Sequence, residues 1–264
     1  MTINQEAASE VRAVESLATL PDLLAGWARS LGEQRAFTFL DYGGDGDAVG
    51  DSLSWRELDQ WVDAVAALLL DRVDAGQRVA ILAGQGLEYV ASFLGALRAG
   101  VVAVPLFAPG LPGHACQLRS VLADCRPALV LTTRAELGPV CRFVGPYQAV
   151  IAVEDIPAGA SPSRPVLDPD SVAYLRYTSG STRAPAGARV THANLVSNAR
   201  QSEAARDGVS EVTAVSSLPL SQDMGLVLSI AGPVALGVPS VLMDPIAFVQ
   251  RPERWLREPA GERA

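Results

Sequence analysis

Hydrophobic and polar positions in the first part of the chain predict a helix followed by a β-hairpin. Residues 20–31 have the spacing of an amphipathic helix, with Thr19 as the expected N-cap. Extended patterns at 37–42 and 52–55 flank the Gly- and Asp-rich segment 43–47. Because glycine and aspartate favour tight turns, these two strands are expected to pair as a hairpin.

A second helix is predicted to begin at a capping-box signature. Ser54 and Glu57 stand three residues apart, so each side chain can bond the backbone amide of the other at the first helical turn. The helix is expected to run to about Arg72, because apolar residues recur along one face. These residues are Leu58, Trp61, Val62, Val65, Leu68 and Leu69.

Beyond this helix, short apolar runs alternate with helical patterns. Strands are expected at 78–83, 101–106, 128–132, 149–153, 171–177, 188–191, 212–216 and 240–243, and helices at 87–98, 114–124, 136–143, 192–206 and 224–236. This alternation predicts βαβ units and a three-layer α/β fold with largely parallel sheets. The Pro- and Ser-rich loop 157–169 is interpreted as a seam between two sub-sheets.

Domain organisation and location follow from composition. Hydrophobic residues make up 49% of the 264 residues and charged residues 19%, which is sufficient for a buried core. Residues 1–16 are expected to be flexible, 17–256 to form an incomplete core and 257–264 a tail. The longest apolar run, 62–70, is too short to span a bilayer, and the N-terminus does not resemble a signal peptide. We therefore expect a soluble, cytoplasmic protein.

The charge of the chain restricts its partners and its chemistry. A net charge of −8 argues against a nucleic-acid partner, since phosphate backbones require clusters of basic residues. All 21 basic residues are arginine, so this chain itself offers no lysine for a Schiff base or a P-loop.

Cysteine and histidine usage does not indicate a metal site. The three cysteines, Cys116, Cys125 and Cys141, contain no CxxC pair, and the histidines are His114 and His192. We therefore expect no disulfide framework, no metal ligands and buried, inert thiols.

The segment with the most chemical information is the loop 177–187. Four hydroxyl side chains surround Gly180, and such a loop can wrap phosphate oxygens with its amides and hydroxyls. Arg183 could add positive charge at the terminal phosphates. An ordinary polar turn has the same composition, so the residues alone leave both interpretations open. The loop is not a P-loop, because the GxxxxGK[ST] spacing is absent.

The loop sequence Tyr-Thr-Ser-Gly-Ser-Thr-Arg-Ala-Pro-Ala-Gly resembles the phosphate loop of the adenylate-forming superfamily, and its second half resembles the fatty acyl-AMP ligase branch. Three other segments, 104–110, 218–226 and 247–256, are similar to that branch in the same order, so the resemblance covers about residues 17–256. It implies an N-terminal part of an enzyme that activates a fatty acid with ATP and Mg²⁺ and transfers the acyl group from acyl-AMP to an acyl carrier protein.

Roles for individual residues follow from this resemblance. The expected ligands of the ATP phosphates are Thr178, Ser179, Gly180, Ser181, Thr182 and Arg183. The residues expected near the acyl carboxylate are Gln222, Asp223, Met224 and Gly225. Leu226, Leu228 and Ile230 are candidates for either the acyl tunnel wall or the core, and His192 with Asn194 is interpreted as a helix cap.

The chain departs from the family pattern at two points. Ser221-Gln222 stands where the family has an aromatic residue and histidine, and glutamine cannot titrate as imidazole does. The sequence also ends before the family's adenine- and ribose-binding segments, its Mg²⁺ ligand and its catalytic lysine, so no complete catalytic set is expected here. The first hypothesis is an acyl-adenylating ligase of which this chain is a fragment, a truncated gene product or one half of a split enzyme. The second is a non-catalytic remnant that binds an acyl chain, nucleotide or partner synthetase, and the third is a generic nucleotide-binding domain.

Overall fold

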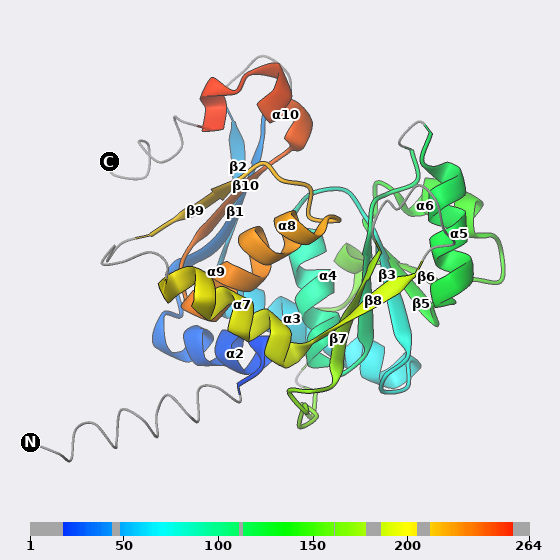
Figure 1. Ribbon diagram of the computed structural model, residues 1–264, viewed down its shortest axis with the longest axis horizontal. Helices are drawn as coiled ribbons and strands as arrows, with labels where there is room; N and C mark the ends of the chain where they lie inside the picture. Colours follow the sequence, from blue (N-terminus) through cyan, green and yellow to red (C-terminus); the bar gives the residue numbers. More distant parts are fainter. Residues whose placement is uncertain are drawn as a thin grey trace, which may run out of the picture.

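The computed structural model contains two β-sheets, with helices between them and on their outer faces (Figure 1). It describes residues 18–43, 48–110, 113–160, 162–177, 186–204 and 212–255. The predicted flexible N-terminus, the turn residues 44–47 and the predicted tail 257–264 lie outside these ranges. No described helix combines the length and the hydropathy that a membrane span requires.

The smaller sheet joins the two ends of the described chain. It has the strand order β2-β1-β10-β9, with β1 Arg35–Asp41, β2 Val49–Ser54, β9 Ala214–Ser216 and β10 Ser240–Met243. β1 and β2 are antiparallel, which confirms the predicted hairpin. β10 pairs in parallel with both β1 and β9, so strands almost 200 residues apart in sequence are neighbours.

The larger sheet has six strands in the order β6-β5-β3-β4-β7-β8. Their bounds are β3 Arg78–Leu82, β4 Val102–Leu106, β5 Leu129–Thr132, β6 Val150–Ala152, β7 Val172–Tyr177 and β8 Gly187–Thr191. Neighbours are parallel except β7 and β8, which are antiparallel. The expected seam at 157–169 is wrong, because that loop connects β6 and β7 of one sheet and takes the chain from its β6 edge to the far side of β4.

The helices agree with the predicted pattern, with two additions. Their bounds are α2 Leu20–Ser30, α3 Trp55–Arg72, α4 Leu87–Arg98, α5 Ala115–Cys125, α6 Leu137–Val144, α7 His192–Ala204, α8 Asp223–Leu226, α9 Gly232–Leu236 and α10 Pro245–Gln250. The helix predicted at 224–236 contains a π-helical segment, Val227–Ala231, between α8 and α9. Asp244 caps α10, which the sequence pattern did not predict, by accepting a bond from the amide of Ile246.

The core explains why the larger sheet has helices on both faces. Val79 and Ile81 of β3 belong to the central cluster with α2, α3 and α4, whereas Ala80 and Leu82 pack with α5 and α6 on the opposite face. Successive strand residues point to opposite faces, and both faces here are apolar, as expected for a buried parallel sheet. The smaller sheet shares the central helices and has α10 on its other face (Figure 1). The predicted α/β class is therefore confirmed.

Helix starts were predicted accurately because they depend on local sequence. Asp22 accepts bonds from the amide and hydroxyl of Thr19 at 3.0 and 2.6 Å. The predicted capping box of α3 is present, since the amide of Glu57 donates to the Ser54 hydroxyl and the Ser54 amide donates back to the Glu57 carboxylate. The bonds that the Ser54 amide and, in addition, the Ser54 hydroxyl donate to the carboxylate lower the pKa of Glu57.

The three cysteines differ in environment. Cys125 is buried, and burial is the main cause that raises its pKa to about 11, so this thiol stays protonated and inert at neutral pH. Cys116 and Cys141 are exposed, so the expectation that all three are buried is wrong. Cys116 lies on α5 and Cys141 lies on α6. These two helices cover an outer face of the larger sheet and present one side to solvent.

His192 is a core residue, whereas Thr191 and Asn194 cap α7. The amide of Thr191 donates to Asn194 and the amide of Asn194 donates to the Thr191 hydroxyl, so the cap does not involve the imidazole. The His192 side chain is 1% exposed, and its Nδ1 has no hydrogen-bond partner within the described structure. Burial lowers the pKa of His192 to about 4, because the interior disfavours the charged imidazolium.

Acidification is therefore expected to destabilise the fold through His192. In the unfolded state the imidazole has a pKa near 6.5 and binds a proton more readily than in the folded state. The contribution of neutral His192 to the unfolding free energy is therefore fully present above pH 6.5 and falls as pH decreases toward 4. The difference amounts to about 2 kcal/mol at pH 5. Urea unfolding at pH 7 and 5 should show this loss in the wild type and in His114→Gln, whereas in His192→Gln the loss should be clearly smaller. An equal pH dependence in all three proteins would contradict the assignment.

Candidate functional site

Strand β7 carries polar residues on both sides as it approaches the predicted phosphate loop. Tyr174 belongs to the central core and Tyr177 packs with the opposite cluster, in keeping with the alternation of a strand. The six residues predicted to bind the ATP phosphates follow directly and lie outside the described residues; they are Thr178, Ser179, Gly180, Ser181, Thr182 and Arg183. Their assignment stays a prediction.

The described residues do place the two ends of this loop. Tyr177 of β7 pairs with Gly187 of β8, and the Tyr177 hydroxyl donates to the carboxylate of Asp124 on α5. Burial, followed by the bond to Asp124, raises the pKa of Tyr177. A Cβ atom at Gly187 would lie 2.9 Å from the Tyr177 ring, so glycine leaves room for the ring to lie against the backbone at residue 187. The loop therefore starts and ends at a fixed strand pair.

Asp223 connects α8 with β7. Its Oδ1 accepts a hydrogen bond from the Tyr174 hydroxyl at 2.8 Å, and its Oδ2 lies 3.2 Å from Nη1 of Arg176. Burial and the adjacent carboxylate raise the pKa of Tyr174, so the tyrosine remains a donor. The predicted acyl-carboxylate residue Asp223 is thus held by two side chains that sequence reasoning did not assign to the site.

A cavity of about 500 Å³ lies between three of the predicted acyl-carboxylate residues and the end of β7, the strand that leads into the predicted phosphate loop. Gln222, Asp223 and Met224 line it from one side, and Arg176 and Tyr177 line it from the strand that enters the phosphate loop. The rest of the wall is mostly apolar and comes from β4, α5 and the chain next to them; it includes Pro105, Leu106, Phe107, Leu118 and Val121. An apolar cavity with a few convergent polar groups is the usual form of a small-molecule site.

Gly225, the fourth predicted residue, has a packing role behind the cavity. A Cβ atom there would lie 2.0 Å from the carbonyl oxygen of Pro219. Only glycine therefore allows α8 to approach the 217–222 loop this closely. The approach places Asp223 beside β7.

The three candidates for the tunnel wall divide into two environments. Leu226 and Ile230 are fully buried members of the central cluster, so the core interpretation describes their position. Leu228 is 47% exposed and lines a small groove between α7 and the π-helical segment. π-Helical turns occur often near functional sites, and this one begins four residues after Asp223.

Gln85 links the two sheets through its side chain. It follows β3 of the larger sheet, and its Nε2 donates to the carbonyls of Leu218 and Met243 at 3.0 and 3.1 Å. Its Oε1 accepts from the amide of Leu220 at 3.0 Å. The side chain therefore holds the loop that precedes Gln222. Its position shortly after a buried strand was the signal available in the sequence.

Gln85→Ala is expected to lower the unfolding free energy by about 2 kcal/mol, because three partly buried backbone groups lose their partner. Gln60→Ala is the matched control, since that exposed α3 side chain should change stability by less than about 0.5 kcal/mol. Chemical denaturation measures both values. Equal stability of the two variants would show that Gln85 does not hold the loop.

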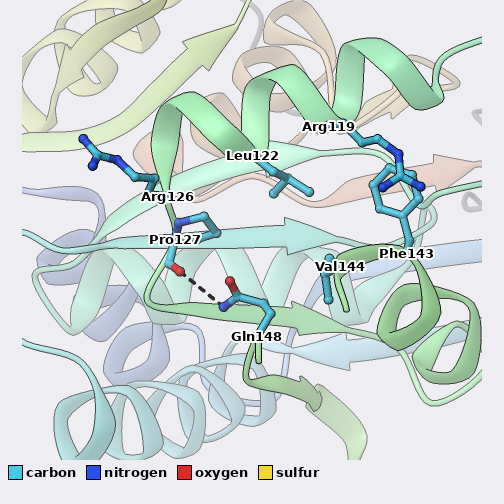
Figure 2. Close-up of a pocket in the computed structure, with 7 residues that line it drawn as sticks. All are labelled: Arg119, Leu122, Arg126, Pro127, Phe143, Val144 and Gln148. Atoms are coloured by element: carbon cyan, nitrogen blue, oxygen red, sulfur yellow. Dashed lines mark hydrogen bonds between the residues drawn. The ribbon is translucent and has the colours of Figure 1, made fainter. Parts of the chain in front are cut away.

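A second hollow of about 440 Å³ lies between α5, α6 and the start of β6 (Figure 2). The Arg119 guanidinium lies 4.5 Å from the centre of the Phe143 ring, and Gln148 donates to the carbonyl of Pro127 (Figure 2). Leu122 and Val144 add apolar surface, and none of the residues assigned to carboxylate binding lines the hollow. The hollow is separate from the candidate site.

The described residues do not supply a metal centre. Among them, no three histidine, cysteine, aspartate or glutamate side chains come together as metal ligands. These residues therefore offer no ready-made cage for a metal ion, and no reaction step is assigned to one here.

Comparison with known proteins agrees with this geometry. The family model described as AMP-binding enzyme matches residues 24–263. The chain is 41% identical over 242 residues to the long-chain-fatty-acid–AMP ligase FadD32 of Mycolicibacterium smegmatis, which covers 88% of this chain and 38% of the relative. It is 42% identical over 244 residues to the putative fatty-acid–CoA ligase FadD21 of Mycobacterium tuberculosis, covering 87% and 42%.

Solved structures show the same correspondence. A fatty acid AMP ligase from Legionella pneumophila superimposes with a TM-score of 0.84 at 29% identity, covering 91% of this chain and 42% of that one. A fatty acyl-adenylate ligase from the same organism, solved with acyl adenylate and pyrophosphate, gives a TM-score of 0.81 at 28% identity, with coverages of 93% and 43%. The chain spans about two fifths of the length of these relatives.

Proposed function

The chain belongs to the AMP-binding enzyme family, and we propose that it supplies the triphosphate- and carboxylate-binding half of a fatty acyl-AMP ligase. The reaction would join a fatty acid carboxylate to the α-phosphate of ATP, giving acyl-AMP and pyrophosphate. The acyl group would then pass to an acyl carrier protein. The observation that carries this proposal is the cavity shared by the Asp223 segment and by the strand that enters the predicted phosphate loop.

The residues of this chain would bind and orient the substrates. The apolar wall formed by Phe107, Leu118 and Val121 suits a hydrocarbon chain, since it removes apolar surface from water. Residues 178–183 would hold the β- and γ-phosphates through hydroxyls and amides. Mg²⁺, when bound, neutralises phosphate charge in such reactions. A complementary C-terminal fragment would supply the remaining groups for catalysis.

ATP–pyrophosphate exchange with dodecanoate tests the proposal. The chain is assayed alone and with a C-terminal fragment made from the part of the M. smegmatis relative beyond the matched region. Whether the chain is assayed alone or with the fragment, exchange is expected to fall about a hundredfold in the double variant Thr178→Ala/Ser181→Ala, because phosphate donors are lost. Ser120→Ala, on the exposed side of α5, should leave it unchanged. The proposal is wrong if two results coincide. Neither the chain alone nor the chain with the fragment catalyses ATP–pyrophosphate exchange, and the chain binds neither ATP nor a dodecanoyl-sulfamoyl-adenosine probe.

A non-catalytic binding protein is the second candidate, and exposed apolar side chains favour it. Ile246 and Val249 are 62% and 76% exposed on one side of α10, and Met224, Leu228 and Trp255 are also exposed. Ile246 and Val249, about one turn apart on α10, form the kind of exposed apolar surface that can bind a partner. Tight binding of the sulfamoyl probe, without exchange in either mixture, would support this candidate over the ligase.

A further inference from the structure

We infer that Arg176 binds the carboxylate of the acid substrate at the mouth of the 500 Å³ cavity, with Asp223 and Tyr174 holding the arginine in position. The inference rests on the proposed function and assigns the head-group contact of the same site. Arg176 would be a specificity residue, and it is not among the site residues predicted from the phosphate loop and from the 222–225 segment.

The first argument is the chemistry of the cavity wall. Its larger part is apolar, and among the described lining residues Arg176 is the one side chain with a permanent positive charge. A cation beside an apolar wall matches a molecule with a hydrocarbon part and one negative charge. A fatty acid anion has this form: its hydrocarbon part would contact the wall, and its carboxylate would reach the guanidinium donors that Asp223 leaves open.

The second argument is the orientation of the guanidinium. One of its terminal nitrogens, Nη1, lies 3.2 Å from Oδ2 of Asp223, and the arginine side chain is still 45% exposed. Arginine carries five N–H donors in a planar fork, so a single contact with Asp223 leaves donors for a second carboxylate. Asp223 is fixed in turn by the Tyr174 hydroxyl at 2.8 Å. The aspartate therefore limits the rotation of the arginine without using all of its donors.

The third argument concerns Gln222, which lines the same cavity. An uncharged glutamine can donate an N–H bond to a carboxylate but cannot provide charge. Arg176, on β7, lines the same cavity and supplies that charge. The two side chains together offer a charged and a neutral donor to one head group.

A pair of ligands that differ in charge tests the inference. Calorimetry should show that the chain binds dodecanoate more tightly than dodecanol. In Arg176→Gln, dodecanoate affinity should fall about tenfold or more, because a charged hydrogen bond is lost, whereas dodecanol affinity should change less than about twofold. Arg176→Lys should retain part of the preference, since it keeps the charge and loses the fork. Arg72→Gln, at the exposed end of α3, is the matched control and should match the wild type.

The outcomes separate this inference from the proposed function. If Arg176→Gln binds dodecanoate as the wild type does, or loses ATP affinity and keeps dodecanoate affinity, the inference is wrong and the ligase proposal stands. If the wild type binds neither ligand and not the sulfamoyl probe, the proposed function itself fails. Thermal unfolding verifies that each variant is folded. If Arg176→Gln does not fold, the binding measurements are made on Arg176→Lys instead.

Discussion

Arg98→Met is expected to lower the unfolding free energy by about 3–5 kcal/mol, because it leaves buried carboxylates without their main partner. The Arg98 side chain is 1% exposed and lies 2.6 Å from Asp59 and 2.9 Å from Asp63 of α3. Nη2 also donates to the carbonyl of Pro21 on α2 at 3.3 Å, so one guanidinium joins three helices. Methionine fills a similar volume but offers no donor, and the carboxylates remain largely shielded from water.

Two other substitutions separate charge from geometry in this cluster. Arg164, from the 157–169 loop, binds the same two aspartates but is 38% exposed, so Arg164→Met should cost only about 1 kcal/mol. Arg98→Lys keeps the charge but not the fork, and it should fall between the other two variants. Guanidinium denaturation measures all three. If Arg98→Met costs no more than Arg164→Met, the buried guanidinium does not hold the helices together.

The same cluster shows which parts of the fold the sequence could predict. α4 was predicted at its observed bounds, because apolar spacing and the following Gly100, with a φ of 69°, are local signals. The burial of Arg98 was not predicted, because its partners come from other elements. Two sheets were expected, but the boundary between them was misplaced for a similar reason: β10 pairs with β1, and nothing local specifies a strand partner so distant in the sequence.

The candidate site follows the same rule. Asp223 was predicted from a contiguous motif, and the structure places it in the cavity. Tyr174, Arg176 and Gln85 were missed, since each acts through a contact with a residue 47 to 158 positions away. The available signal was a polar residue within β7 for Tyr174 and Arg176, and a polar residue shortly after β3 for Gln85. Local sequence therefore predicted the elements, and long-range contacts decided which side chains meet.

Gly225→Ala is expected to lower the unfolding free energy by about 3 kcal/mol, at the upper end of what overpacking usually costs. The added methyl group would lie 2.0 Å from the carbonyl oxygen and 2.6 Å from the carbonyl carbon of Pro219. Both are backbone atoms, so no side-chain rotation relieves the overlap and α8 must move away from the loop. In a chain of this size, the midpoint of thermal unfolding should fall by roughly 6–12 °C.

Gly26→Ala provides the matched control for this prediction, because its Cβ would have nothing within 4 Å and it lies inside α2. Alanine is a better helix former than glycine, so this variant should be more stable by up to about 1 kcal/mol. The opposite signs separate a local overlap from a general effect of the substitution. Wild-type stability of Gly225→Ala would contradict the close packing of α8.

Gly225→Ala is also expected to impair the site, since α8 carries Asp223. Movement away from Pro219 also displaces that carboxylate from Tyr174 and Arg176, which lie 2.8 and 3.2 Å from it. Dodecanoate affinity of the folded Gly225→Ala protein should therefore fall, although the added methyl group lies behind the cavity and contacts no ligand. A glycine selected for close backbone packing would then control the position of the charged pair. Unchanged affinity in a destabilised variant would show instead that the packing of α8 and the geometry of the site are independent.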